Sequence, residues 1–139
     1  MDAAIQPIRV AWEPDFEVGQ VLLDAQHRAL LAQCDLLADL AGCGADPQRF
    51  DEAFARLRTL AREHFETEAG VLAAAGDPDH GDCRLDGAEF DDLADDIVTT
   101  EHFDRIELQR FLALWWIGHL RGTVAHQRAW VEGGSGNGR

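Results

Sequence analysis

Apolar residues recur along this chain at intervals of three and four, the spacing of one face of an α-helix. Four such stretches follow one another, separated by short segments rich in glycine, proline and aspartate. The pattern predicts helices over about 19–41, 47–75, 82–99 and 104–131. No alternation of apolar and polar residues is long enough for a strand, apart from a weak candidate at Ile8 to Val10.

The ends of these stretches carry helix-boundary signals. Asp46 and Pro47 supply an N-cap and a first-turn proline for the second helix, and Gly76 followed by Pro78 ends it. We therefore expect an all-α fold, an up-down-up-down four-helix bundle. Residues 1–18 would form an N-terminal arm, 19–131 the bundle and 132–139 a flexible C-terminal tail.

The third and fourth helices are predicted to present distinct rows of residues. On the third, an acidic row is expected to be a solvated face: Asp91, Asp92, Asp95 and Asp96. On the fourth, the inward stripe is expected to hold residues at helical spacing: Leu108, Leu112, Trp115, His119, Thr123, His126 and Trp130.

Composition narrows the class of protein. The chain has 139 residues, 46% of them hydrophobic, which suits one domain with one core. A net charge of −14 argues against nucleic-acid and anionic-membrane partners, because both require a basic face. The cysteines Cys34, Cys43 and Cys83 have no CxxC spacing, and no secretion signal or membrane-length apolar run is present, so a cytoplasmic protein is expected.

Polar residues on the predicted apolar stripes are the informative feature. His27, His64 and His119 lie on three different helices, and Glu68 follows His64 by one turn, so that both can reach one point. A buried carboxylate beside buried imidazoles is costly unless a cation satisfies the charge. One histidine on an apolar face is weak evidence of a site, but the conjunction across three helices indicates a metal site in the core.

These residues stand in segments that resemble the bacterial hemerythrin family from Trp12 to about Trp130. WEPDFEVGQVLLDAQH is similar to the family's arm and first helix, HFETE to its second-helix ligand motif, and WWIGHL to its fourth-helix motif. The resemblance implies a four-helix bundle holding two bridged irons with seven protein ligands. Four of these ligands carry over: His27, His64, Glu68 and His119.

The other three ligand positions of the family fall on Cys83, Gly87 and Val124, which implies a depleted centre in place of an ordinary di-iron site. The four retained residues would hold a single iron or zinc ion. Cys83 is a further candidate ligand, or simply a small buried residue. Gly87 either leaves space for a ligand or water, or is covered by Trp115 or Trp116.

Two other histidines are not expected to join this centre. His80 lies near Pro78, ahead of the third helix, and His126 lies seven residues after His119, roughly 10 Å further along its helix.

Two functions from different classes fit these observations. The first is a metal-binding protein with an altered iron site that binds or senses a diatomic molecule, dioxygen or nitric oxide. The second is a metal-free scaffold for protein interaction or signalling, with an unidentified protein partner. No separate acid, base or substrate motif is present, so we expect no enzyme.

Overall fold

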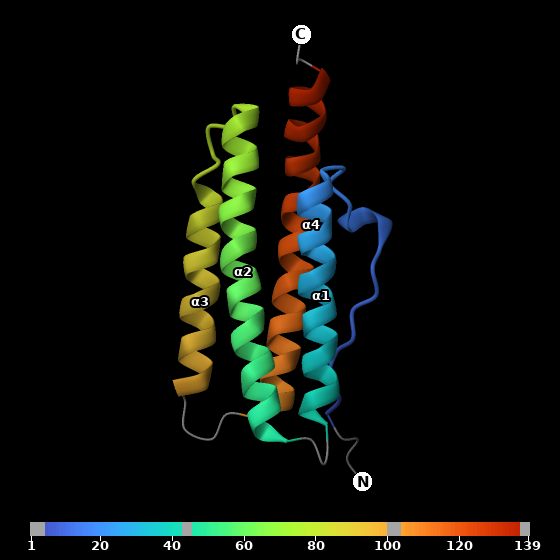
Figure 1. The fold of residues 1–139 in the computed structure, drawn as a ribbon, viewed down its shortest axis with the longest axis vertical. Helices are drawn as coiled ribbons and strands as arrows, with labels where there is room; N and C mark the ends of the chain where they lie inside the picture. Colours follow the sequence, from blue (N-terminus) through green and yellow to red (C-terminus); the bar gives the residue numbers. More distant parts are fainter. Residues whose placement is uncertain (1–4, 43–45, 100–103, 137–139) are drawn as a thin grey trace.

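The computed structural model describes residues 5–42, 46–99 and 104–136, with side chains described as far as residue 131. Within these residues the chain is all-helical and has no strand, which confirms the predicted all-α class. A short 3₁₀-helix precedes four α-helices (Figure 1): η1 Pro14–Phe16, α1 Val21–Ala41, α2 Pro47–Ala75, α3 Asp82–Thr99 and α4 Arg105–Gly136. The arrangement is consistent with a four-helix bundle. No described helix is long and apolar enough to cross a membrane.

The ends of α2 follow the signals in its sequence. The Asp46 side chain accepts a hydrogen bond from the Gln48 amide at 2.9 Å, and Pro47 occupies the first turn. At the other end Gly76 adopts φ 91°, a left-handed conformation that glycine reaches without strain. Its amide bonds to the last carbonyls of the helix, including Ala73 O.

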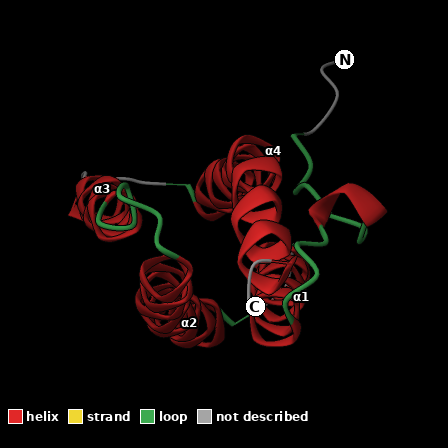
Figure 2. Cartoon of the chain, turned by 90° about the horizontal axis from the view of Figure 1, so that it is seen from above, coloured by secondary structure: helices red, strands yellow, loops and turns green. Residues whose placement is uncertain are grey.

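The helices enclose a shared core, with the N-terminal arm lying outside α1 and α4 (Figure 2). The stripes predicted for α1 and α2 are buried along most of their length. The largest fully buried side chains of the core come from the arm and from all four helices: Phe16, Leu23, Leu30, Phe50, Leu57, Phe90, Leu112 and Trp116. Burial of these side chains supplies the main stabilisation, about 1.5–3 kcal/mol for each large apolar group.

The predicted inward face of α4 is correct at Leu108, Leu112 and His119, but beyond Leu112 most of the buried row lies one position later in the chain than predicted. Trp116, Leu120 and Val124 are buried, whereas Trp115 is only partly buried and the His126 side chain is 50% exposed. Apolar residues occupy two adjacent rows of this helix, so periodicity leaves the choice between them open. Packing decides it, because Trp116 stacks on Phe65 of α2.

The acidic row of α3 is only partly solvated. Arg58 donates to Asp95 at 2.6 Å and to Asp91 at 3.2 Å, and Arg62 donates to the other Asp91 oxygen at 3.1 Å. Arg58 is mostly shielded from water, so these pairs join α3 to α2 more firmly than exposed pairs would.

The arm is extended but does not form the weakly predicted strand. Its backbone polar groups bond to side chains, because no second strand lies beside it. The Ile8 amide donates to Gln109 Oε1 at 2.7 Å, the Ile8 carbonyl accepts from Gln109 Nε2 at 2.6 Å, and the Val10 amide donates to Asp35 at 2.8 Å.

At the other end of the chain α4 continues to Gly136, past the predicted end at residue 131. A long helix propagates into the glycine-rich segment because each added residue gains one hydrogen bond without a new nucleus. Cys43 and residues 137–139 of the predicted tail lie outside the described residues.

Candidate metal centre

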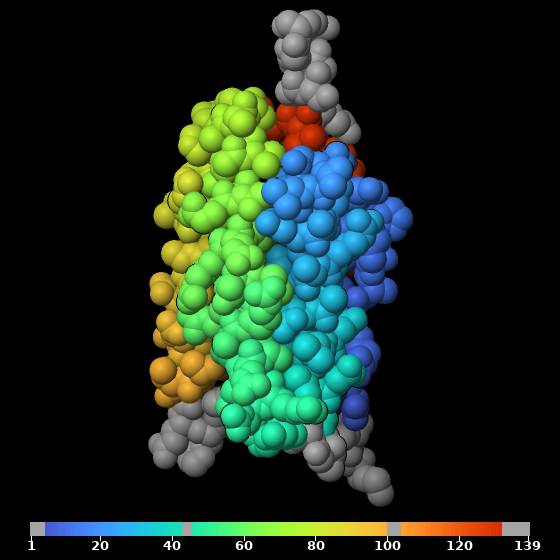
Figure 3. All heavy atoms as spheres, in the orientation of Figure 1, coloured from blue at the N-terminus to red at the C-terminus, as the bar shows by residue number. Residues whose placement is uncertain are grey.

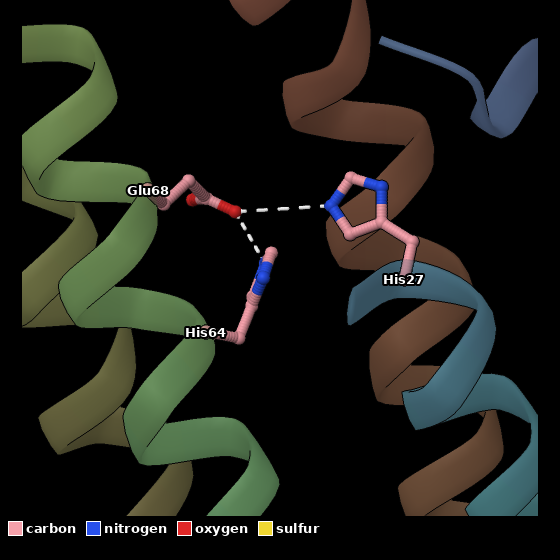
Figure 4. Close-up of side chains that lie close together, drawn as sticks. All are labelled: His27, His64 and Glu68. Carbon is pink, nitrogen blue, oxygen red and sulfur yellow. Dashed lines mark ion pairs between the residues drawn. The ribbon is translucent and has the colours of Figure 1, made fainter. Parts of the chain in front are cut away.

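Three of the four predicted ligands meet in the core between α1 and α2 (Figure 4). His27 comes from α1, while His64 and Glu68 lie one turn apart on α2. The two histidines are 0% exposed and Glu68 is 1% exposed. His64 Nε2 contacts Glu68 Oε2, and His27 Nε2 lies 4.0 Å from the same oxygen. One ligand atom from each residue lies within 4.8 Å of the others.

The fourth predicted ligand reaches the same carboxylate from α4. His119 Nε2 lies 3.4 Å from Glu68 Oε2, and the residue is 8% exposed. Its ring lies parallel to that of Trp115, 5.4 Å between centroids, which fixes the ring plane. All four predicted residues therefore gather around one oxygen atom.

A chain of hydrogen bonds fixes the tautomer of His64. The Thr67 hydroxyl donates to the Glu63 carbonyl at 2.9 Å, so it accepts from Gln26 Nε2 at 3.0 Å. Gln26 therefore turns its carbonyl oxygen toward His64 Nδ1, 3.0 Å away, and that nitrogen must donate. The proton of neutral His64 is thereby held on Nδ1, which leaves the Nε2 lone pair facing Glu68.

His27 is oriented in the same way by the arm. Its Nδ1 lies 3.4 Å from the Phe16 carbonyl oxygen, which can only accept. The arm is held there by Asp24, which accepts from the Val18 amide at 2.7 Å and the Gly19 amide at 3.1 Å. Gly19 has φ 95°, a left-handed conformation suited to glycine, so the turn brings both amides to one carboxylate.

Two groups of the centre, His64 and Glu68, have shifted pKa values. Burial lowers the pKa of His64, so its imidazole is neutral at pH 7. Burial acts to raise the pKa of Glu68, but the neighbouring imidazoles, His119 foremost, outweigh burial and lower it, so this group is a carboxylate. Neither His27 Nε2 nor His64 Nε2 has a hydrogen-bond partner among the described residues.

A metal ion fits this set of atoms. A single proton could satisfy only one of the unpaired nitrogens, whereas an ion bonds to several lone pairs at once. Ligand atoms at about 2.0–2.2 Å from one zinc or iron ion lie roughly 3–4 Å apart, and the His119–Glu68 and His27–Glu68 separations of 3.4 and 4.0 Å match that range. The contact between His64 and Glu68 is closer than this range, so one of these two side chains would move apart from the other to admit an ion. Imidazole with carboxylate is a donor set that suits either metal.

Cys83, the further candidate, lies against the outer side of this group. It is 6% exposed and lines the same cavity as Glu68. Burial, followed by the charge of Glu68, raises the pKa of Cys83 to about 12, so the thiol is neutral at pH 7. Cys83 stands outside the cluster of His27, His64 and Glu68.

The space that a side chain at Gly87 would enter is occupied by Phe65, not by Trp115 or Trp116 directly, although Gly87 also lines a cavity of about 340 Å³ between α2 and α3. A Cβ atom on Gly87 would lie 3.0 Å from Phe65 Cδ2 and 3.2 Å from its Cβ. Phe65 in turn stacks on Trp116, 5.5 Å between centroids. Val124 is 2% exposed and belongs to the apolar core. This half of the core is therefore packed with apolar groups.

The two remaining histidines of interest lie apart from the centre. His80 Nδ1 is 2.8 Å from the Asp77 carbonyl, in the turn before α3. His126 Nε2 is 2.7 Å from Asp77 Oδ2. His80 therefore lies in the turn between α2 and α3, and His126 contacts this turn from α4.

Sequence reasoning missed the supporting role of Gln26 and Thr67. The available signal was their position, since each directly precedes a ligand residue in the chain, His27 or Glu68.

Comparison with family models, curated proteins and solved structures gave no match to this chain.

Proposed function

We propose that this protein binds one divalent metal ion, iron or zinc, in its helical core. His27, His64 and Glu68 would hold the ion, with His119 as a fourth ligand. The observation that carries the proposal is a pair of buried nitrogen atoms, His27 Nε2 on α1 and His64 Nε2 on α2, that face the Glu68 carboxylate. Neither nitrogen has a hydrogen-bond partner among the described residues. Leaving such groups unsatisfied would cost about 1–3 kcal/mol each.

The same proposal extends to a hemerythrin-like protein with a depleted site. The colour gradients of successive helices in Figure 1 support the expected up-down-up-down order. The role we propose is binding or sensing of dioxygen or nitric oxide in the cytoplasm, without enzymatic activity. An iron ion held by three or four protein ligands keeps a position open for a small molecule, whereas a zinc ion with four protein ligands would be closed. The apolar packing around Phe65 favours one ion over two.

A metal-free scaffold for protein interaction or signalling is the second candidate. It is favoured by the hydrogen bond between His119 Nε2 and Glu68 Oε2, because this contact partly satisfies the carboxylate without an ion. The two candidates differ at Nε2 of His27 and of His64: these nitrogens bind an ion in the first candidate and bind none in the second.

Elemental analysis of protein produced with iron and zinc available separates the candidates. We expect close to one metal per chain in the wild type and almost none in His64→Ala. His80→Ala removes a histidine outside the centre and serves as the matched control, with metal content unchanged. An ultraviolet-visible spectrum of the ferrous protein, before and after dioxygen or nitric oxide, tests binding of the small ligand.

The outcomes are distinct. About two irons per chain would contradict the depleted site and restore ordinary di-iron chemistry. A well-folded wild type without metal, even after incubation with ferrous iron or zinc, would leave the scaffold as the function. Equal metal loss in His64→Ala and His80→Ala would place the ion elsewhere.

A further inference from the structure

A cavity of about 470 Å³ opens between the end of α2, the start of α3 and the facing side of α4. Glu68 lines this cavity, whereas His27 and His64 do not. No arginine or lysine lines it, and its walls carry several carboxylates: Glu68, Asp77, Asp79, Asp82 and Asp86. The cavity therefore joins the candidate centre to solvent through an acidic passage.

Burial of the carboxylates increases along this passage. Asp79 and Asp82 are exposed, Asp86 is half-buried, and Glu68 is 1% exposed. A second cavity of about 380 Å³ shares Asp86 and reaches His119. Two openings therefore meet at Asp86 and lead to two of the candidate ligands.

The electrostatics of the passage favour cations. Burial, together with the charges of Glu68, Glu89 and Asp82, raises the pKa of Asp86 in spite of His119 nearby. A cleft of one charge sign raises the local concentration of opposite ions and increases association rates by about 10–10³-fold. Gln127 adds a buried amide to the wall, and its Oε1 has no hydrogen-bond partner among the described residues.

On the face formed by α1 and α2, the described residues cover His27 and His64. His27 and His64 are 0% exposed. Their helices meet along most of their length on the face drawn in Figure 3. On the outside of α1, the carbonyl of Phe16 in the arm covers His27 Nδ1.

We propose that the acidic cavity is the entrance through which a hydrated divalent cation reaches Glu68. This inference rests on the proposed metal-binding function and adds its loading route. The cavity holds on the order of ten water molecules, so a cation enters with its hydration shell and exchanges water for protein ligands at the inner end. Asp82 and Asp86 act as positioning residues that concentrate the cation outside the core.

The first test measures the rate at which metal-free protein takes up Co²⁺, using quenching of tryptophan fluorescence in a stopped-flow instrument. Trp116 is a suitable reporter because its ring lies 5.8 Å from that of His64. The double variant Asp82→Asn, Asp86→Asn is expected to bind Co²⁺ about tenfold more slowly at low ionic strength. This difference is expected to disappear near 0.5 M salt, because screening removes long-range attraction.

The matched control removes two charges outside the cavity. Glu52→Gln with Asp92→Asn changes the net charge equally, and both residues are exposed and absent from the cavity wall. We expect less than about a twofold change in its association rate, since the charges are remote from the entrance. Equal slowing of both double variants would overturn the entrance and assign the effect to net charge.

The second test narrows the passage without changing charge. Gly122 lies on its α4 wall and has open space around its Cβ position, so Gly122→Leu can be accommodated. We expect association and dissociation of Co²⁺ to slow by the same factor, leaving the dissociation constant unchanged. Gly70→Leu, at an exposed glycine of α2 away from the cavity, is the control.

The inference and the proposed function fail in different ways. Wild-type protein that takes up no Co²⁺, Fe²⁺ or Zn²⁺ would refute the metal-binding function and the entrance with it. Wild-type protein that binds Co²⁺, with unchanged rates in both cavity variants, would overturn the entrance alone.

Discussion

Replacing Gly87 by alanine tests whether Phe65 closes the space beside α3. The added Cβ would lie 3.0 Å from Phe65 Cδ2, 3.1 Å from Cγ and 3.2 Å from Cβ, all tighter than the 3.4 Å at which ordinary contact begins. Phe65 cannot withdraw easily, because it is 3% exposed and lies against Trp116 and His119, with centroid separations of 5.5 and 5.1 Å. The substitution therefore overpacks the core.

Two opposing terms set the magnitude. Alanine in a helix interior is favoured over glycine by about 1 kcal/mol. Overpacking of a filled core costs about 1–3 kcal/mol. We therefore expect Gly87→Ala to lower the free energy of unfolding by about 1 kcal/mol. Gly70→Ala, at an exposed position of α2 with no atom within 4 Å of its Cβ, should raise it by about 1 kcal/mol.

Urea unfolding followed by far-ultraviolet circular dichroism measures both free energies, and near-ultraviolet spectra report on the stacked Trp116. The expected gap of about 2 kcal/mol between the two variants exceeds the usual extrapolation error. Equal stabilisation by Gly87→Ala and Gly70→Ala would refute the packing argument. The same steric clash with Phe65 predicts that the double variant Cys83→His, Gly87→His is less stable than the wild type and shows no second metal ion in elemental analysis.

Three further expectations concern the centre and its surroundings. Gln26→Leu should weaken metal affinity by about 10–100-fold without changing stoichiometry, because His64 loses the acceptor that orients its ring. Competition with a chromophoric chelator measures the affinity, and an unchanged affinity would contradict the role of the hydrogen-bond chain. Chelation of the ion should lower the melting temperature, since binding at 100 times the dissociation constant adds about 2.7 kcal/mol. Burial acts to raise the pKa of Asp77, but its contacts with the Asp79 amide and His126 outweigh burial and lower it below 3.8. Stability from this carboxylate is therefore full above pH 3.8 and lost as pH falls through the lower folded-state value. Asp77→Asn should destabilise by about 1 kcal/mol at pH 7 and by less as the pH falls through the folded-state pKa of Asp77, which acid and urea unfolding would check.

The local pattern of the chain was sufficient to predict the helices and much of the candidate site. Apolar spacing and end signals such as Asp46 and Gly76 depend on residues within a few positions of one another, so they can be recognised without tertiary information. His64 and Glu68 follow from the same logic, because residues four apart on a helix share a face. His27 and His119 were predicted because they stand on apolar stripes.

Tertiary structure decided what depends on contacts between distant segments. Two adjacent apolar rows on α4 were equally compatible with its sequence, and stacking of Trp116 on Phe65 selected the inward one. The carbonyl of Gln26 reaches His64 only because α1 and α2 pack side by side. The acidic cavity likewise exists because the start of α3 and the facing side of α4 border the same space as Glu68. These features depend on the register between helices, which short-range periodicity does not specify.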